Sequence, residues 1–222
     1  MKRPVLEAAW DFAISHLTAE EIFDVGVTAY FRGESRQAER LFAAVALPGR
    51  TSYVVGPAIL NLGILLTEQG RPAEAEEAYR QAIASGHADQ APRAAVNLGV
   101  LLSKQGRPAE AEEAYRQAIA SGHADQAPRA AVNLGILLSE QGRPAEAEEA
   151  YRQAIASGHA DTAPTAAVNL GVLLSEQGRP AEAEESYRQA IASGHADQAP
   201  RAADNLGALL KERGRPEANQ SE

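Results

Sequence analysis

The sequence contains no cysteine, which excludes disulfide bonds, thiol catalysis and cysteine-based metal sites. Aromatic residues make up only 5% of its 222 residues, and no apolar run approaches the roughly 20 residues that a membrane span needs. The formal net charge of −9 argues against a nucleic-acid partner, because binding phosphates takes clustered lysine and arginine. No phosphate-binding glycine loop or dinucleotide fingerprint is present.

The chain also lacks a convincing targeting signal at its start. The segment MKRPVLEAAWDFAISHL has two basic residues followed by an apolar stretch, but Glu7 and Asp11 interrupt that stretch and no small-residue cleavage site follows. We therefore expect no signal peptide, no membrane partner and a cytoplasmic location.

What the sequence does contain is a repeat. The triplet Asn-Leu-Gly recurs at a spacing of 36 residues, beginning at Asn61, Asn97, Asn133, Asn169 and Asn205. Residues 93–128 and 129–164 differ at only three positions. A divergent unit comes before them, in which Gly26 and Phe42 stand where Gly63 and Tyr79 stand in the next unit.

Each unit predicts two helices with explicit ends. In one copy, the first helix is expected from about Arg93 to Gln105, with Gly106 as a left-handed cap. Pro108 then begins the second helix, where its missing N–H is harmless. That helix is expected to end at Ser121-Gly122, and residues 123–128 form the connection.

Helical periodicity places an apolar stripe on both helices. On the first helix it comprises Ala95, Leu98, Gly99 and Leu102, and on the second Ala111, Ala114, Tyr115, Ala118 and Ile119. Gly99 recurs in every unit although glycine weakens a helix, so we expect the second helix to approach it closely near Ala111. A single helix pair cannot bury its apolar face alone, and the units must stack.

The pattern of Leu98, Gly99, Leu102, Gly106, Ala111, Tyr115 and Ala118 resembles the tetratricopeptide repeat. The resemblance extends from about residue 20 to 216, with a 36-residue unit instead of the family's usual 34. It implies an all-α fold, a right-handed α-solenoid of helix-turn-helix repeats. We divide the chain into an N-terminal capping or docking helix (1–18), a divergent first repeat (19–50), four near-identical repeats (51–200) and a C-terminal capping helix with a polar tail (201–222).

In proteins similar to this one, the exposed face of the first helices lines a concave groove that binds peptides. By that resemblance we predict a protein or peptide ligand. The predicted contacts are Asn61, Asn97, Asn133, Asn169, Asn205, Arg93, Arg129, Arg201, Val96, Val100, Val132, Ile136, Val168, Val172 and Lys104.

Two questions about this face stay open at the level of sequence. The asparagine side chains could instead bond to neighbouring helices and fix the spacing of the repeats. Some relatives recognise carboxylates, and Arg93, Asn97 and Arg129 could do so here. However, Glu68, Glu140, Glu176 and Glu212 lie nearby, which favours a mixed-charge, partly apolar ligand. Near-identical units further favour a repetitive ligand with several similar contacts.

Nothing in the sequence predicts an enzyme, a cofactor or a metal site. The recurring Ser-Gly-His-Ala-Asp (residues 121–125 and copies) contains the side chains of a hydrolytic triad, but neighbours in a turn cannot form the relay. The copies of His123 are expected too far apart to share one metal ion. Glu112, Glu113 and Arg116 are interpreted as an ordinary solvated face.

The two ends suggest an alternative function. Residues 4–17 predict an amphipathic helix with Trp10 as its largest apolar residue, either a cap or a docking element. Residues 201–213 resemble a first helix without its second helix, so Leu206, Gly207 and Leu210 are expected to be partly exposed. Head-to-tail self-association into a homo-oligomer is therefore the alternative. A spacer without a dedicated ligand, or an array partly designed by consensus, is a third reading.

Overall fold

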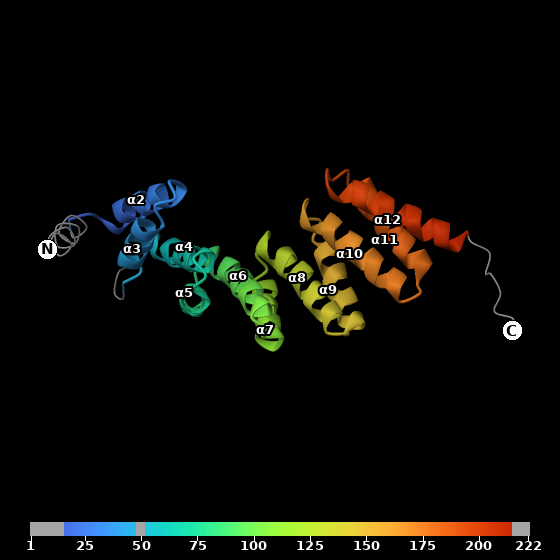
Figure 1. Cartoon of the computed structure of the whole chain (residues 1–222), viewed down its shortest axis with the longest axis horizontal. Helices are drawn as coiled ribbons and strands as arrows, with labels where there is room; N and C mark the ends of the chain where they lie inside the picture. The colour runs from blue at the N-terminus through green and yellow to red at the C-terminus, as the bar shows by residue number, and fades with distance from the viewer. Residues whose placement is uncertain (1–15, 48–51, 215–222) are drawn as a thin grey trace. The chain divides into compact units, whose positions relative to one another are not determined.

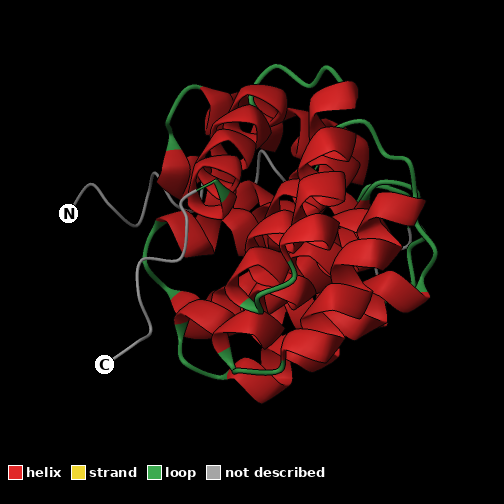
Figure 2. Cartoon of the chain, turned by 90° about the vertical axis from the view of Figure 1, so that its right-hand side faces the viewer, coloured by secondary structure: helices red, strands yellow, loops and turns green. Residues whose placement is uncertain are grey.

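The computed structural model describes residues 16–47 and 52–214, and every regular element in these ranges is a helix (Figure 2). The expected helix of residues 4–17, with Trp10, lies almost entirely outside the described residues. Figure 1 labels the helices in chain order. Their bounds are α2 (Ala19–Phe31), α3 (Ser35–Val45), α4 (Val55–Glu68), α5 (Pro72–Ala84), α6 (Gln90–Lys104), α7 (Pro108–Ala120), α8 (Gln126–Glu140), α9 (Pro144–Ala156), α10 (Thr162–Glu176), α11 (Pro180–Ala192) and α12 (Gln198–Arg213).

The chain forms two compact units, Met1–Leu101 and Leu102–Glu222. In the first unit α2 packs against α3, α3 against α4 and α4 against α5. In the second unit each helix from α7 to α12 packs against the next, and α8, α10 and α12 also pack against one another in sequence. This is the all-α helical repeat solenoid that the sequence predicts.

The turns within the repeats form as the glycine and proline positions predict. Gly106 adopts a φ of 70° and Gly142 a φ of 69°. After α8, the N–H of Arg143 donates to the carbonyl of Leu138 at 2.9 Å, which closes a Schellman turn. Proline is the first residue of α5, α7, α9 and α11.

One predicted boundary is wrong. The first helix of the repeat begins at Gln90 in α6, not near Arg93. Pro92 therefore lies in the first turn of the helix, where proline is tolerated because its N–H would have no intrahelical acceptor. The connection that was expected over residues 123–128 shortens accordingly, since α8 already begins at Gln126.

The second helix approaches the recurring helical glycine closely, as expected, but the nearest atoms belong to a tyrosine ring and not to the alanine at the position of Ala111. A Cβ on Gly135 would lie 2.4 Å from Cε1 of Tyr151, and one on Gly63 would lie 2.6 Å from Cε1 of Tyr79. These tyrosines are buried. The second helix of each such repeat thus presses an aromatic ring against the backbone of the first helix, which leaves no room for a side chain.

Charged residues of the second helices hold successive repeats together. Arg143, just before α9, bonds Glu146 in the first turn of that helix at 2.5 Å and Glu112 of the preceding repeat at 2.6 Å. Glu112 also pairs with Arg116 at 2.7 Å, and its side chain is only 17% exposed. The interpretation of Glu112 as part of an ordinary solvated face is therefore wrong. The same arrangement joins Arg71 to Glu39, Arg179 to Glu148 and Arg213 to Glu184.

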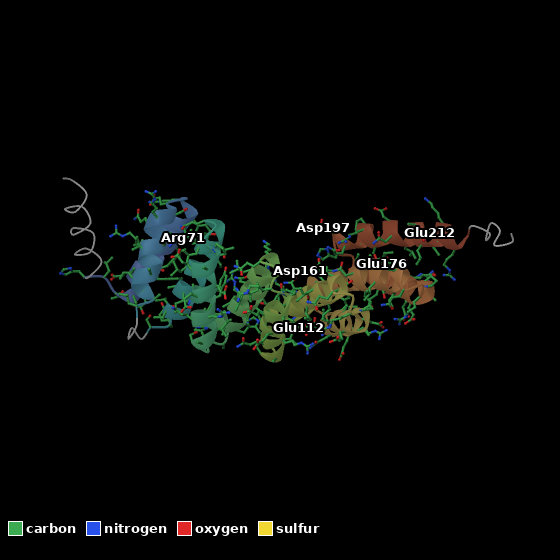
Figure 3. All side chains as sticks on the ribbon, turned by 60° about the horizontal axis from the view of Figure 1, so that its bottom comes forward. Arg71, Glu112, Asp161, Glu176, Asp197 and Glu212 are labelled. Carbon is green, nitrogen blue, oxygen red and sulfur yellow. The ribbon has the colours of Figure 1, made fainter. Side chains whose placement is uncertain are left out.

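The recurring histidine belongs to the turn that starts each first helix. Nδ1 of His159 accepts the backbone N–H groups of Asp161 and Thr162 at 3.3 and 3.4 Å. Its Nε2 lies 3.4 Å from a carboxylate oxygen of Asp125 in the preceding turn. The imidazole therefore satisfies free N–H groups at the start of α10 and connects two turns. In Figure 3 Asp161 and Asp197 lie at the starts of α10 and α12, and Glu176 and Glu212 lie toward the opposite ends.

Candidate functional site

The candidate site is the asparagine face, which we define as the surface of the first helices around Asn61 and Asn97 in the first unit and Asn133, Asn169 and Asn205 in the second. All five asparagines are half-buried. In the described ranges none of their side-chain amides has a hydrogen-bond partner. The donor and acceptor groups of these amides are therefore unsatisfied by other described residues.

Three of the predicted apolar contacts do not lie on this face. Val96, Val132 and Val168 are 1%, 6% and 0% exposed, and their inclusion among the ligand contacts is corrected. They belong to the core, because neighbouring helices cover the first helix on this side as well. The other aliphatic row is accessible, with Ile136 at 39% exposure and Val100 and Val172 half-buried.

In the first unit, the asparagine face contains a cavity of about 330 Å³ that is mainly apolar. Four elements contribute to it, each with one or more side chains. The lining residues are Val27, Tyr30, Phe31, Phe42, Asn61, Ile64 and Arg93. We call this the aromatic pocket.

In the second unit, a cavity of about 320 Å³ lies at the same position of the repeat. Its lining residues include Ile136, Ser139, Glu140, Tyr151, Asn169, Val172, Glu176 and Arg201. We call this the acidic pocket. In both pockets an aliphatic side chain and an aromatic ring come from one repeat, an asparagine from the next, and an arginine from the one after that.

The cations of this face are free of the ion pairs that other arginines make. Over the described residues, neither Arg93, Arg129, Arg201 nor Lys104 has a carboxylate within ion-pairing distance. All four are exposed. The arginines that precede the second helices are all engaged by glutamates, as Arg143 is. The asparagine face thus presents cations that no carboxylate of the described residues pairs with.

The charges on this face also vary together along the sequence. Glu140 and Arg201 line the same pocket. At the equivalent positions one repeat earlier, Lys104 replaces the glutamate and Thr165 replaces the arginine. The face consequently carries both signs of charge.

A buried aromatic ring lines each pocket, Phe42 in the aromatic pocket and Tyr151 in the acidic pocket. Burial, with a smaller contribution from the Glu140 carboxylate, raises the pKa of Tyr151 and of Tyr115 to about 12. Both phenols therefore stay protonated at neutral pH. The pKa of Tyr30 is also raised, chiefly because its hydroxyl donates to Glu68 at 2.7 Å.

No cluster of three or more potential metal ligands occurs among the residues that the structure describes. In the same ranges, no helix has both the length and the hydrophobicity to cross a bilayer.

Sequence reasoning missed the residues that distinguish the two pockets. Tyr30 and Phe31 occupy the positions of Ser139 and Glu140, and they lie in the divergent first repeat. Their departure from the repeat pattern was the available signal. It indicates a function only once the structure shows that both side chains line a cavity.

Comparisons with known proteins agree with this architecture. Among curated proteins, none matches the sequence significantly. Solved structures with a similar fold include a MamA protein (TM-score 0.63, 20% identity, 79% of this chain and 91% of that one). They also include pilF of Pseudomonas aeruginosa (0.63, 21%, 88% and 91%) and BtubC from P. vanneervenii (0.64, 19%, 91% and 84%).

Comparison with models of protein families identifies the family of this chain. One family model of the tetratricopeptide repeat matches residues 57–121 and 93–158, and a second matches residues 132–200. Together they cover well over half of the chain and coincide with the helix pairs from α4 to α11. The chain belongs to the tetratricopeptide repeat family.

Proposed function

We propose that this protein is a non-catalytic scaffold in the cytoplasm that binds a segment of another protein on its asparagine face. The observation that carries the proposal is the contrast between two sets of polar groups. Arginines and glutamates of the second helices bond to each other across repeats, whereas the asparagines and cations of the first helices have no protein partner in the described ranges.

A peptide backbone fits this face chemically. A side-chain amide can accept one backbone N–H and donate to one backbone carbonyl, and such amides recur once per repeat. Accessible aliphatic side chains such as Ile136 and Val172 lie beside them in the same cavity. Several weak and similar contacts along one ligand add up to useful affinity.

The proposal is tested with peptides selected from a random library on the full-length chain and titrated by fluorescence anisotropy. In the test variant, Asn133, Asn169 and Asn205 are all changed to alanine. In the control variant, three amides of the second helices (Gln117, Gln153 and Gln189) are changed instead; they have the same spacing and are exposed. We expect binding to weaken at least about tenfold in the first variant only. Equal losses in both variants, or a loss in the control alone, would contradict the proposal.

A second candidate function is self-association through α12. Leu210 is 45% exposed, and a Cβ on Gly207 would meet no atom within 4 Å, so the surface that a second helix covers in other repeats is open among the described residues. Light scattering over a range of protein concentrations tests this candidate. A molar mass that rises with concentration and falls to that of a monomer in Leu210→Glu supports it, and a monomer at every concentration eliminates it.

A further inference from the structure

The aromatic pocket and the acidic pocket occupy equivalent positions but differ in two side chains. Tyr30 and Phe31 in the first replace Ser139 and Glu140 in the second. The asparagine, the aliphatic residue and the arginine are retained as Asn61, Ile64 and Arg93. A ligand side chain that enters the first cavity therefore meets aromatic rings where one entering the second meets a carboxylate.

Phe31 is the most exposed large apolar side chain in the described ranges, at 81%. It is the last residue of α2, and its ring packs edge-on against that of Tyr30 with centroids 5.7 Å apart. Tyr30 is in turn held by its hydrogen bond to Glu68. Exposing an aromatic side chain to water is unfavourable, so a ligand that covers this aromatic pair beside the cavity gains free energy.

The cavity has room for one large side chain. Apolar cavities of about 150 Å³ accommodate benzene, and the aromatic pocket measures about 330 Å³. A smaller or polar side chain would leave part of the apolar lining uncovered or would lose its own hydration.

Arg93 supplies the charge at this pocket. No carboxylate within the described residues forms an ion pair with it. By contrast, Arg71 in the same unit bonds both Glu39 and Glu74. The guanidinium of Arg93 makes no ion pair within the described residues and can therefore pair with an anionic group of a ligand at the pocket.

We propose that the aromatic pocket is a specificity site for a protein segment that presents a large apolar side chain with an acidic side chain two residues away. In an extended chain, residues i and i+2 face the same side, so one can enter the cavity while the other reaches Arg93. Asn61 then lies beside the backbone between them. This inference rests on the proposed function and specifies the partner's chemistry at the aromatic pocket of the first unit.

The test uses the same random peptide library on the full-length wild type and on Phe31→Glu. The substitution places at position 31 the residue type that occupies the equivalent position 140, and Phe31 is exposed, so the fold is expected to be retained; circular dichroism verifies this. Tyr53, which is 73% exposed in the same unit but does not line the pocket, provides the control variant Tyr53→Ser.

We expect the wild type to enrich peptides with an apolar residue and an acidic residue at i and i+2. Their affinity should fall at least about tenfold in Phe31→Glu and stay unchanged in Tyr53→Ser. Changing the acidic residue of the peptide to its amide should weaken binding to the wild type but not to Arg93→Gln, as a double-mutant cycle requires for a direct pair.

Several results would overturn the inference. In the first, selected peptides bind Phe31→Glu as tightly as the wild type but lose affinity for the triple asparagine variant. This result would leave the proposed function intact and refute only the specificity site. Binding that depends on a free peptide C-terminus and not on an internal acidic residue would assign Arg93 to terminal carboxylates. If no peptide depends on either set of residues, the proposed function fails together with the inference.

Discussion

The contact between a helical glycine and a tyrosine ring gives a prediction with an internal control, because the same repeat position occurs with and without the ring. Gly135 lies against Tyr151, and an added Cβ would be 2.4 Å from Cε1 and 2.9 Å from Cζ of that ring. At Gly207 in α12 a Cβ would meet nothing within 4 Å. Both glycines are in the interior of a first helix.

Changing either glycine to alanine gains about 0.5–1 kcal/mol from helix propensity. In Gly135→Ala this gain competes with a steric cost of about 1–3 kcal/mol, the usual range for overpacking. Tyr151 is 3% exposed, so its ring cannot move aside without disturbing the core. We expect Gly207→Ala to stabilise the protein. The free energy of unfolding of Gly135→Ala should be about 1–3 kcal/mol lower than that of Gly207→Ala.

Urea unfolding and thermal melting measure the difference. For a chain of this length, 1 kcal/mol corresponds to about 2–4 °C in the melting temperature. Gly135→Ala should therefore melt several degrees below Gly207→Ala. If both substitutions stabilise the protein equally, the tyrosine ring does not constrain the glycine and the explanation of the repeat pattern is refuted. Restoring the stability of Gly135→Ala with Tyr151→Leu would identify the ring as the obstacle.

Three further predictions concern the contacts between repeats. Glu112→Gln should lower the free energy of unfolding, measured by urea titration, by about 1 kcal/mol, because it removes the negative charge that pairs with Arg143. The control Glu113→Gln, at an exposed position, should change it by less than about 0.5 kcal/mol. Arg143 lowers the pKa of the Glu112 carboxyl below its ordinary value of 4.5. The stabilisation from this ion pair is therefore complete above pH 4.5 and is lost as the pH falls through the folded-state pKa. Unfolding curves at decreasing pH should show a smaller loss of stability in Glu112→Gln than in the wild type. His159→Ala should cost about 1 kcal/mol, as loss of a helix cap does, and should speed amide hydrogen exchange at Thr162, whereas unchanged exchange would exclude the capping role.

The helix pairs could be predicted from the sequence because their signals are local. Glycine after one helix and proline at the start of the next fix the turn, and the structure confirms this at Gly106 and Pro108. The start of the first helix was misplaced because Pro92 resembles a boundary, although proline is compatible with the first turn.

The burial of Val96, Val132 and Val168 could not be predicted in the same way. A helical wheel gives the direction of a side chain around one helix, but burial depends on which neighbouring helices cover that direction. The pairing of Glu112 with Arg143 is also missed, because the two residues are 31 positions apart and meet only when repeats stack. The aromatic pocket needs side chains from several helices, so sequence showed Tyr30 and Phe31 only as departures from the pattern.

The central claim is that the polar groups of the asparagine face are not needed for folding and are available to a ligand. Its most direct test is the free energy of unfolding of the variant in which Asn133, Asn169 and Asn205 are alanine, measured alone and with a selected peptide. Without peptide, the variant should be as stable as the wild type or more so, because alanine has the higher helix propensity. The stabilisation that the peptide gives the wild type should be lost. A loss of about 1 kcal/mol per asparagine without peptide, as for a broken internal hydrogen bond, together with undiminished stabilisation by the peptide, would contradict the claim.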